Sequence, residues 1–227
     1  MSDVEITVVD SAAEAARVVA ERLAEQARTG GSVVLTGGST PRVAYEIAAE
    51  LEPDWSRAEL WWGDERCVPP DDELSNYGMA KAALLDRLEG APASVHRMQG
   101  ELGRDDGARE YRHELANVGD FDLVLLGLGP DGHVASLFPR FPTLDVTNRD
   151  VLSTEAGHEP FVDRISMTLP RICATRELLF LIAGEDKAEA AALALAGPPS
   201  RETPGSLARS AEGTTRAVLD RAAAAKL

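Results

Sequence analysis

A histidine and an aspartate stand two residues apart in a glycine-bearing segment near the middle of the chain. The segment reads Gly127-Leu128-Gly129-Pro130-Asp131-Gly132-His133 and follows an apolar stretch, 121–126. An imidazole changes charge near about pH 6.5 in ordinary surroundings, which suits a general base at neutral pH. The pair is therefore a candidate for acid–base catalysis, and the alternative is an ordinary surface histidine.

A second candidate segment combines two glycines with two hydroxyl groups, in the order Thr36-Gly37-Gly38-Ser39-Thr40-Pro41. Glycines let the backbone approach an anion, and the helix expected to begin at Pro41 offers free N–H groups and the positive end of its dipole. The segment predicts a phosphate site. The alternative is an ordinary strand–helix turn with Thr40 as the N-cap. A Walker loop is excluded, because that motif needs four residues between its glycines and a lysine after the second glycine, and this segment has neither.

Charged residues follow two further predicted strands. Asp64-Glu65-Arg66 comes after two tryptophans and a glycine, and precedes a long loop that ends in Ser75-Asn76-Tyr77. Lys187 falls in the first turn of a predicted helix, where the helix dipole disfavours a cation unless an anion binds nearby. A solvated loop and a surface lysine are the alternatives.

The hydrophobic pattern predicts strands that alternate with helices. Strands are expected at 5–9, 32–36, 59–63, 95–98, 121–126, 151–153, 164–169 and 177–183, and helices at 11–29, 41–51, 76–88, 105–117, 185–196 and, rich in alanine, from about Thr214. This alternation indicates a three-layer, doubly wound, mainly parallel α/β fold, which we expect to form one domain over residues 1–227. Ligands bind outside the carboxyl ends of such strands, so the segments described above should converge there.

The glycines at 127, 129 and 132 also spell the G-x-G-x-x-G fingerprint of dinucleotide-binding proteins, with Asp150 further on. Two prolines, Pro139 and Pro142, would cut short the helix that this motif requires. Asp150 moreover precedes its predicted strand, whereas the ribose-binding acid should end one. Dinucleotide binding is therefore the weaker interpretation.

Composition limits the possible partners and the compartment. A hydrophobic content of 44% is ordinary for a folded domain, and a formal net charge of −15 argues against nucleic acid as a partner. The N-terminus, from Met1 to Glu5, is acidic and unlike a signal peptide, and no apolar run approaches the roughly 18 residues of a membrane span. We expect a soluble cytoplasmic protein without a membrane partner, with Cys67 and Cys173 as free thiols.

No metal or other cofactor is expected. The four histidines (His96, His113, His133 and His158) and the two cysteines are scattered without the spacing of metal ligands. Nothing in the sequence determines the oligomeric state, and a monomer is the default expectation.

Six segments, taken in order, resemble the 6-phosphogluconolactonases, within the group of sugar-phosphate isomerase-like proteins that includes the glucosamine-6-phosphate deaminases. The resembling segments are 35–41, 62–69, 75–76, 126–139, 164–170 and 184–187. They cover most of the chain from about residue 33 to 190, and their order makes the resemblance specific. It implies the sugar-phosphate isomerase-like fold.

The resemblance also implies an activity and a site. The activity is hydrolysis of 6-phospho-D-glucono-1,5-lactone to 6-phosphogluconate in the oxidative pentose phosphate pathway, with this sugar phosphate lactone as the partner. His133 would be the catalytic base, assisted by Asp131 or Glu65. The substrate would be bound by Gly37, Gly38, Ser39, Thr40, Arg164 and Lys187 at its phosphate and by Asp64, Arg66 and Asn76 at its sugar ring. Backbone N–H groups of 129–132, or Arg66, could stabilise the oxyanion.

Two other functions stay open. The related deaminases continue the histidine loop with an Asn-Glu-Pro segment, whereas this chain has Ser136-Leu137-Phe138-Pro139, the form of the lactonases. An isomerase or deaminase would need a carboxylate base, for which Asp64 and Glu65 are the candidates. A non-catalytic sugar-phosphate sensor would keep the phosphate site but would not need His133.

Overall fold

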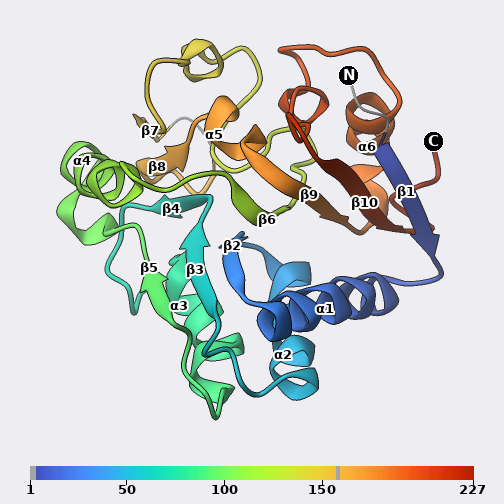
Figure 1. The fold of residues 1–227 in the computed structure, drawn as a ribbon. Helices are drawn as coiled ribbons and strands as arrows, with labels where there is room; N and C mark the ends of the chain where they lie inside the picture. The colour runs from blue at the N-terminus through green and yellow to red at the C-terminus, as the bar shows by residue number, and fades with distance from the viewer. Residues whose placement is uncertain (1–3, 157–158) are drawn as a thin grey trace.

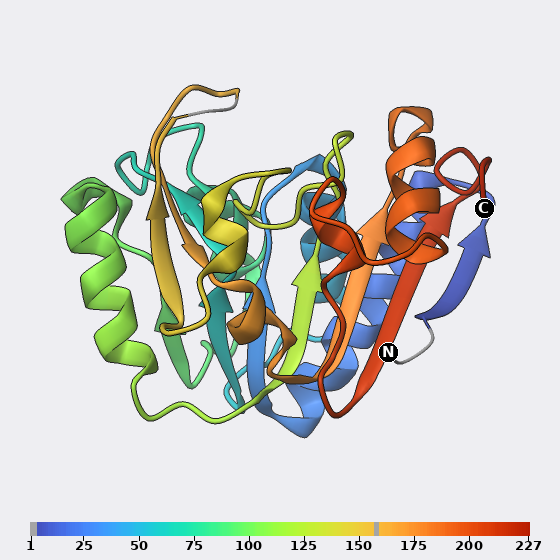
Figure 2. The same cartoon turned by 90° about the horizontal axis from the view of Figure 1, so that it is seen from above.

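A seven-stranded sheet, parallel throughout, forms the centre of the computed structural model, which describes residues 4–156 and 159–227 (Figure 1). In spatial order its strands are β1 (Val4–Val9), β10 (Thr214–Asp220), β9 (Thr175–Ile182), β6 (Phe121–Leu126), β2 (Gly31–Leu35), β3 (Ala58–Trp62) and β5 (Ser94–His96). Because the strands are parallel, their carboxyl ends meet at one edge of the sheet, toward the top of Figure 2. The predicted mainly parallel α/β fold is confirmed.

Helices cover both faces of this sheet (Figure 1). On one side lie α1 (Ala12–Thr29), α2 (Ser39–Leu51) and α3 (Asn76–Ala83), and on the other α4 (Arg104–Leu115), α5 (Leu169–Cys173) and α6 (Ala188–Leu195). The side chains of β6 alternate between the two cores, since Leu123 and Leu125 pack with α1 and α2 while Val124 and Leu126 pack on the opposite face. A strand buried on both faces is expected to be mostly apolar, and in β6 only Asp122, near its start and partly exposed, is polar.

Short 3-10 turns complete the helical segments, namely η1 (Leu85–Arg87), η2 (Gly100–Leu102), η3 (Pro142–Asp145), η4 (Glu185–Lys187) and η5 (Pro204–Ser206). The helix predicted over 76–88 therefore ends at Ala83 and continues only as η1. The helix predicted from 185 begins as η4 and becomes α6 at Ala188.

A second, antiparallel sheet of three strands lies over one end of the molecule. Its order is β4 (Asp64–Arg66), β8 (Arg164–Met167) and β7 (Val151–Thr154). The two strands predicted near 151 and 164 are present, but the Asp64–Arg66 segment, expected as a loop, is a strand that pairs with β8. This pairing sets Arg66 opposite Arg164, so it brings two distant predicted site residues together.

The C-terminal helix predicted from about Thr214 is wrong. Residues 214–220 form strand β10, which lies between β9 and β1 with Thr215, Ala217 and Leu219 fully buried. Pairing on both sides and burial outweigh the helix propensity of alanine, because propensity is a weak preference that tertiary contacts override. The alanines at 222–225 follow the strand in turns.

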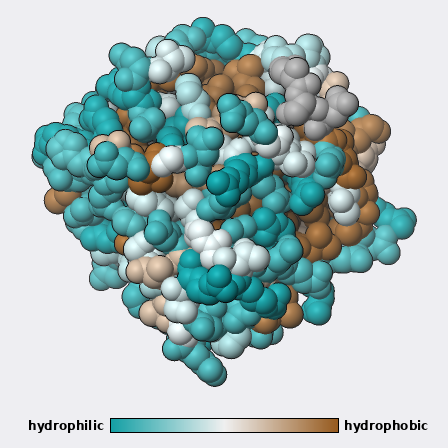
Figure 3. All heavy atoms as spheres, viewed as in Figure 1, coloured by the Kyte–Doolittle hydropathy of each residue, from teal (hydrophilic) through white to brown (hydrophobic). Residues whose placement is uncertain are grey.

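The surface is mostly hydrophilic on the face shown in Figure 3, with hydrophobic groups gathered at the side where β1 lies in Figure 1. In β1, the side chains of Ile6 and Val8 are 41% and 49% exposed, because this strand is an edge of the sheet. Within residues 4–156 and 159–227, no helix has the length and apolar character needed to cross a bilayer. Met1–Asp3 and His158, which figured in the sequence analysis, lie outside the described residues.

Candidate active site

A cavity of about 210 Å³ lies over the carboxyl ends of four strands of the main sheet. Its walls include Thr36 after β2, Asp64 after β3, Gly127 after β6 and Lys187 after β9, as expected for a doubly wound fold. The predicted residues among those that line it are Gly37, Gly38, Asp64, Arg66, Asn76, His133, Arg164 and Lys187. The fold thus gathers residues from six separate segments of the sequence in one place.

Within the described part of the chain, four predicted residues do not line this cavity. Ser39 and Thr40 follow Gly38 directly, in the first turn of α2, and Ser39 is exposed. This helix begins two residues earlier than predicted, and its N-cap is Gly38 rather than Thr40. Asp131 lies behind His133, and Glu65 is buried beside the N-terminus of α3.

The imidazole of His133 is held by Asp131. A distance of 2.6 Å separates His133 Nδ1 from Asp131 Oδ1, and the His133 backbone N–H donates to the same oxygen at 3.1 Å. A carboxylate can only accept, so it favours the neutral tautomer that carries the proton on Nδ1 and the lone pair on Nε2. An imidazole oriented in this way can take a proton from a water molecule.

Glycine at 129 is a requirement of this pair. A Cβ atom there would come within 2.1 Å of His133 Nδ1 and 2.6 Å of Asp131 Oδ1. Residues 127–141 form turns, with the first helical turn only at Pro142–Asp145, so the phosphate-binding helix of a dinucleotide fold does not follow β6. Of the three glycines of the apparent fingerprint, Gly129 and Gly132 serve the packing of the histidine loop, whereas a Cβ at Gly127 would meet no other atom of the described residues within 4 Å.

Three cationic side chains line the cavity, namely Arg66, Arg164 and Lys187. Arg164 is only 4% exposed, and burial lowers the pKa of its guanidinium, an effect that the charge of Asp64 partly offsets. Its Nη2 donates to the carbonyl oxygens of Glu159 and Pro160 at 3.2 and 3.3 Å. Lys187 Nζ lies 3.1 Å from Asp186 Oδ2. The cavity can therefore receive an anion despite the net charge of −15.

Asp64 is fixed by donors from two other segments. Ser136 Oγ donates to Asp64 Oδ2 at 2.7 Å, and Asn76 Nδ2 donates to Oδ1 at 3.2 Å and to the Asp64 backbone oxygen at 2.9 Å. Gly37 leaves room for Asn76, because a Cβ at 37 would lie 2.0 Å from Asn76 Oδ1. Ser136 was missed as a site residue, although it lies in the longest segment that carries the family resemblance.

Glu65 stabilises the local structure. Its carboxylate accepts hydrogen bonds from the backbone N–H groups of Arg66, Asn76 and Tyr77 and from the hydroxyl of Ser75. Burial raises the pKa of Glu65, and the three backbone donors lower it in part. Of the two acids considered as partners of His133, it is Asp131 that accepts a hydrogen bond from His133 Nδ1.

Two of the backbone groups considered for the oxyanion already have acceptors. The N–H of Gly129 donates to His133 O and that of Gly132 donates to Gly129 O, both at 2.9 Å. Arg66, the other group considered, also lines the cavity. Its Nη1 donates to Leu74 O at 2.6 Å, and among the described residues its buried Nε has no hydrogen-bond partner.

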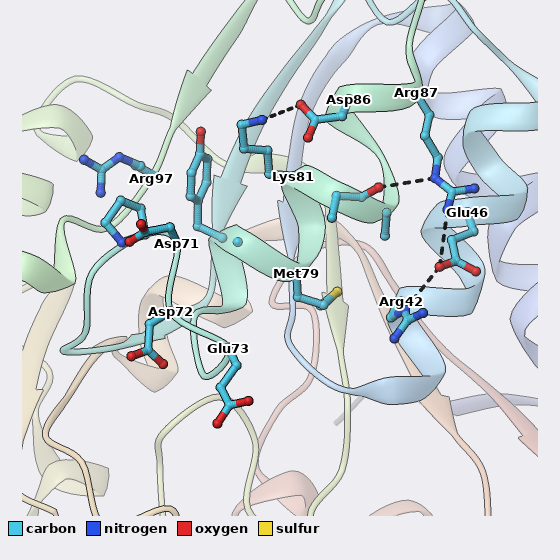
Figure 4. Close-up of a pocket in the computed structure, with 15 residues that line it drawn as sticks. Arg42, Glu46, Asp71, Asp72, Glu73, Met79, Lys81, Asp86, Arg87 and Arg97 are labelled. Carbon is cyan, nitrogen blue, oxygen red and sulfur yellow. Dashed lines mark hydrogen bonds and ion pairs between the residues drawn. The ribbon is translucent and has the colours of Figure 1, made fainter.

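A larger cavity of about 770 Å³ lies beside α3 and the loop before it (Figure 4). Its charged side chains are largely paired with one another, as Arg42 and Arg87 lie 3.1 and 3.6 Å from Glu46 and Lys81 bonds to Asp86. Within the part of the chain that the structure describes, none of its lining residues is a predicted site residue. The smaller cavity is therefore the candidate active site.

The described residues contain no group of three or more His, Cys, Asp or Glu side chains that could hold a metal ion.

Comparisons with known proteins agree with the resemblance found in the sequence. The model of the glucosamine-6-phosphate isomerases/6-phosphogluconolactonase family matches residues 7–217. A 6-phosphogluconolactonase of Streptomyces coelicolor is 42% identical over 234 residues, which cover 95% of this chain and 89% of the relative. The 6-phosphogluconolactonase structure from Trypanosoma brucei superposes with a TM-score of 0.87 at 26% identity and full coverage of both chains. That from Thermotoga maritima gives 0.83 at 28%, covering 96% of this chain and 100% of the other. This chain belongs to the glucosamine-6-phosphate isomerase/6-phosphogluconolactonase family.

Proposed function

We propose that this chain hydrolyses 6-phospho-D-glucono-1,5-lactone to 6-phosphogluconate, with His133 as the general base. The observation that carries the proposal is the 2.6 Å contact between Asp131 and His133 in a cavity that also presents Arg66, Arg164 and Lys187. A base beside a cluster of cations suits attack of water on an anionic ester. The name of the Streptomyces relative supports the same activity, which belongs to the oxidative pentose phosphate pathway.

The proposed reaction proceeds through a tetrahedral intermediate. Nε2 of His133 takes a proton from a water molecule while the water oxygen bonds to the lactone carbonyl carbon, and the carbonyl oxygen becomes an oxyanion beside Arg66. When the carbonyl re-forms, the bond between this carbon and the ring oxygen breaks. The ring oxygen takes the proton from the histidinium and leaves as the C5 hydroxyl. Asp131 stabilises the transient positive charge on His133.

The phosphate group holds the ring in place during this reaction. Arg164 and Lys187 would bind it together with the N-terminal turn of α2 at Gly38, Ser39 and Thr40, where helix N–H groups lack intrahelical acceptors. Asp64 would accept hydrogen bonds from hydroxyl groups of the sugar, and Asn76 would donate hydrogen bonds to them. Fixing both ends of the substrate supplies the proximity contribution to catalysis.

The geometry favours hydrolysis over its rivals. An isomerase or deaminase needs a carboxylate that removes a proton from carbon, but Asp64 already accepts from Ser136 and Asn76, and Glu65 accepts four hydrogen bonds beside α3. A sensor would have no use for an Asp131–His133 pair. The cytoplasmic location, the monomeric state and the absence of a nucleic-acid partner stay predictions of the sequence.

Replacing His133 by alanine tests the proposal. We expect kcat for the phosphorylated lactone to fall about 10²- to 10⁴-fold with little change in KM, because the base is lost while the phosphate site remains. The rate should be followed as loss of lactone, with the spontaneous opening subtracted. A His133→Ala enzyme that keeps nearly full activity would show that another group activates the water.

Chelation gives an independent check. The proposed steps use only side chains of this chain, so the rate should be unchanged after exhaustive treatment with EDTA. Loss of activity that zinc or manganese restores would contradict the mechanism, because a metal would then have to activate the water.

A further inference from the structure

Phe138 contacts two side chains that serve different steps of the proposed reaction. The centroid of its ring lies 4.9 Å from that of His133, with the planes inclined by 55°. The guanidinium carbon of Arg164 lies 5.5 Å from the centroid of the same phenyl ring. Phe138 is 2% exposed and, among the described residues, is not part of the cavity lining. It can therefore act on the reaction only through its neighbours.

The position of the Phe138 ring is set by the turn before it and by an aromatic neighbour. The Leu137 N–H donates to Val134 O at 2.9 Å, which closes a turn in which Ala135 has a φ of 48°. A non-glycine residue in this left-handed region is strained and persists only where the surrounding structure determines it. Phe141 packs against Phe138 edge-on, with centroids 5.6 Å apart. The ring is thus held firmly enough to orient what it touches.

The contact with Arg164 has a clear physical benefit. This guanidinium is 4% exposed, so it has given up most of its hydration, and two carbonyl oxygens at 3.2 and 3.3 Å replace only part of it. The negative face of an aromatic ring attracts a cation, more strongly where water is excluded. Phe138 therefore helps to hold the guanidinium group of Arg164 in one orientation inside the protein.

The contact with His133 complements the hydrogen bond to Asp131. That bond fixes the Nδ1 side of the imidazole, but the ring could still tilt about the line that joins the two residues. A phenyl ring packed at 4.9 Å restricts this tilt and so keeps Nε2 directed toward the water. A small misplacement of a catalytic group is costly, since effective catalysis depends on near-attack geometry.

We propose that Phe138 is a shared positioning residue, which aligns the catalytic base and the phosphate-binding arginine against one aromatic ring. The inference rests on the proposed function of His133 and Arg164 and adds that Phe138 is coupled to each of them. One substitution should then impair binding and chemistry separately, each through its own partner.

Two double-mutant cycles test this coupling. Phe138→Leu keeps an apolar side chain but removes the ring. We expect the dissociation constant of 6-phosphogluconate, measured by calorimetry, to rise roughly 3- to 20-fold and kcat to fall roughly 3- to 10-fold. In an Arg164→Ala background, Phe138→Leu should no longer weaken binding but should still lower kcat. In a His133→Ala background the reverse should hold, with weaker binding and no further loss of kcat.

Controls separate this inference from the proposed function. Phe121→Leu makes the same chemical change at a fully buried ring that contacts Arg171 and is not among the residues lining the cavity, so it should leave binding and kcat unchanged. Phe138→Met serves as a second ring-free variant if Phe138→Leu fails to fold. If the single His133 and Arg164 variants keep normal activity and binding, the proposed function fails and the inference with it. If those variants behave as proposed but the effects of Phe138→Leu are the same in every background, only the coupling is wrong.

Discussion

Arg164 and Lys187 bring two different kinds of positive charge to the cavity. The guanidinium of Arg164 is planar and can meet phosphate oxygens with two parallel hydrogen bonds, whereas the ammonium of Lys187 is a mobile point charge. Burial of Arg164 at 4% exposure makes its hydrogen bonds to an anion stronger, because less water competes for it. We therefore expect Arg164 to be the main determinant of phosphate affinity.

This expectation predicts a difference between substrates. A charge-assisted hydrogen bond contributes about 1.5–3 kcal/mol, so Arg164→Ala should weaken binding of the phosphorylated lactone by roughly one to two orders of magnitude. Arg164→Lys should restore only part of the affinity, because the charge returns without the planar geometry. Steady-state kinetics with the phosphorylated lactone and with unphosphorylated gluconolactone would measure both effects.

The unphosphorylated lactone is the control. The wild type should hydrolyse it poorly, and Arg164→Ala should leave that rate nearly unchanged. Equal damage to both substrates would mean that Arg164 supports the fold or the chemistry and that the phosphate binds elsewhere.

Among the secondary-structure elements, α3 depends most visibly on a single buried carboxylate. Glu65, in β4, accepts from the backbone N–H groups of Asn76 and Tyr77, which lie in the first turn of the helix, and from the Ser75 hydroxyl. These are groups that a helix N-terminus leaves without intrahelical acceptors. Since Asn76 also donates to Asp64, Glu65 helps to position one wall of the cavity.

Glu65→Gln should lower the free energy of unfolding by about 1–3 kcal/mol at pH 7. One carboxylate oxygen, which accepts hydrogen bonds, would be replaced by an NH₂ group, which cannot accept them from the surrounding N–H and O–H donors. Urea denaturation would measure the loss, and Glu73→Gln, on the neighbouring loop, is a matched control that should have little effect. If Glu65→Gln is as stable as the wild type but has lost all activity, Glu65 acts in the chemistry after all.

The pH dependence of this difference has a defined sign. Burial raises the pKa of Glu65 above its ordinary value of 4.5. Between 4.5 and the raised pKa, the folded protein therefore holds a proton that the unfolded chain has released. The contribution of Glu65 to stability is fully present below 4.5 and is lost as the pH rises through the raised pKa. The stability deficit of Glu65→Gln should therefore grow as the pH is lowered from 7 toward 4.5. A deficit that shrinks over this range would indicate that the pKa is lowered instead.

Across the whole molecule, the two ends of the chain meet in one sheet. β1 pairs with β10 over six residues in each strand, and Arg216 of β10 lies 2.8 Å from Glu5 of β1. The side chains of β1 are largely exposed, so the strand contributes mainly by satisfying the backbone of β10 and covering its edge. The candidate active site lies over other strands of the sheet.

Removal of residues 1–9 should therefore separate stability from function. We expect the Tm to fall by roughly 5–10 °C and aggregation to increase, because β10 would become an unprotected edge. Activity per folded molecule should stay close to that of the full chain. Thermal denaturation, light scattering and titration of active sites would measure these effects.

The point variant Val8→Thr is the control, since an exposed β-branched side chain is replaced by another. Its stability should lie within about 0.5 kcal/mol of the wild type. A truncated protein that is folded but inactive would show that β1 influences the site, contrary to the position of the cavity.

Local patterns in the sequence were sufficient to predict the parallel α/β fold and most of the cavity. The apolar run at Phe121–Leu126 predicted a strand covered on both faces, and the glycine, histidine and charged segments lie after strands as expected. Each of these signals is carried by neighbouring residues, and the parallel fold then places the strand ends at one edge. That is why residues from four segments could be assigned to one site before their geometry was known.

Contacts between distant segments follow from the folded arrangement and from no local pattern. Ser136 and Asp64, 72 residues apart, bond to each other because β4 lies beside the histidine loop. The helix predicted from Thr214 became β10 because β1 and β9 flank it. Backbone pairing and burial act between segments that meet only in the folded chain, so no periodicity within either segment could predict the outcome.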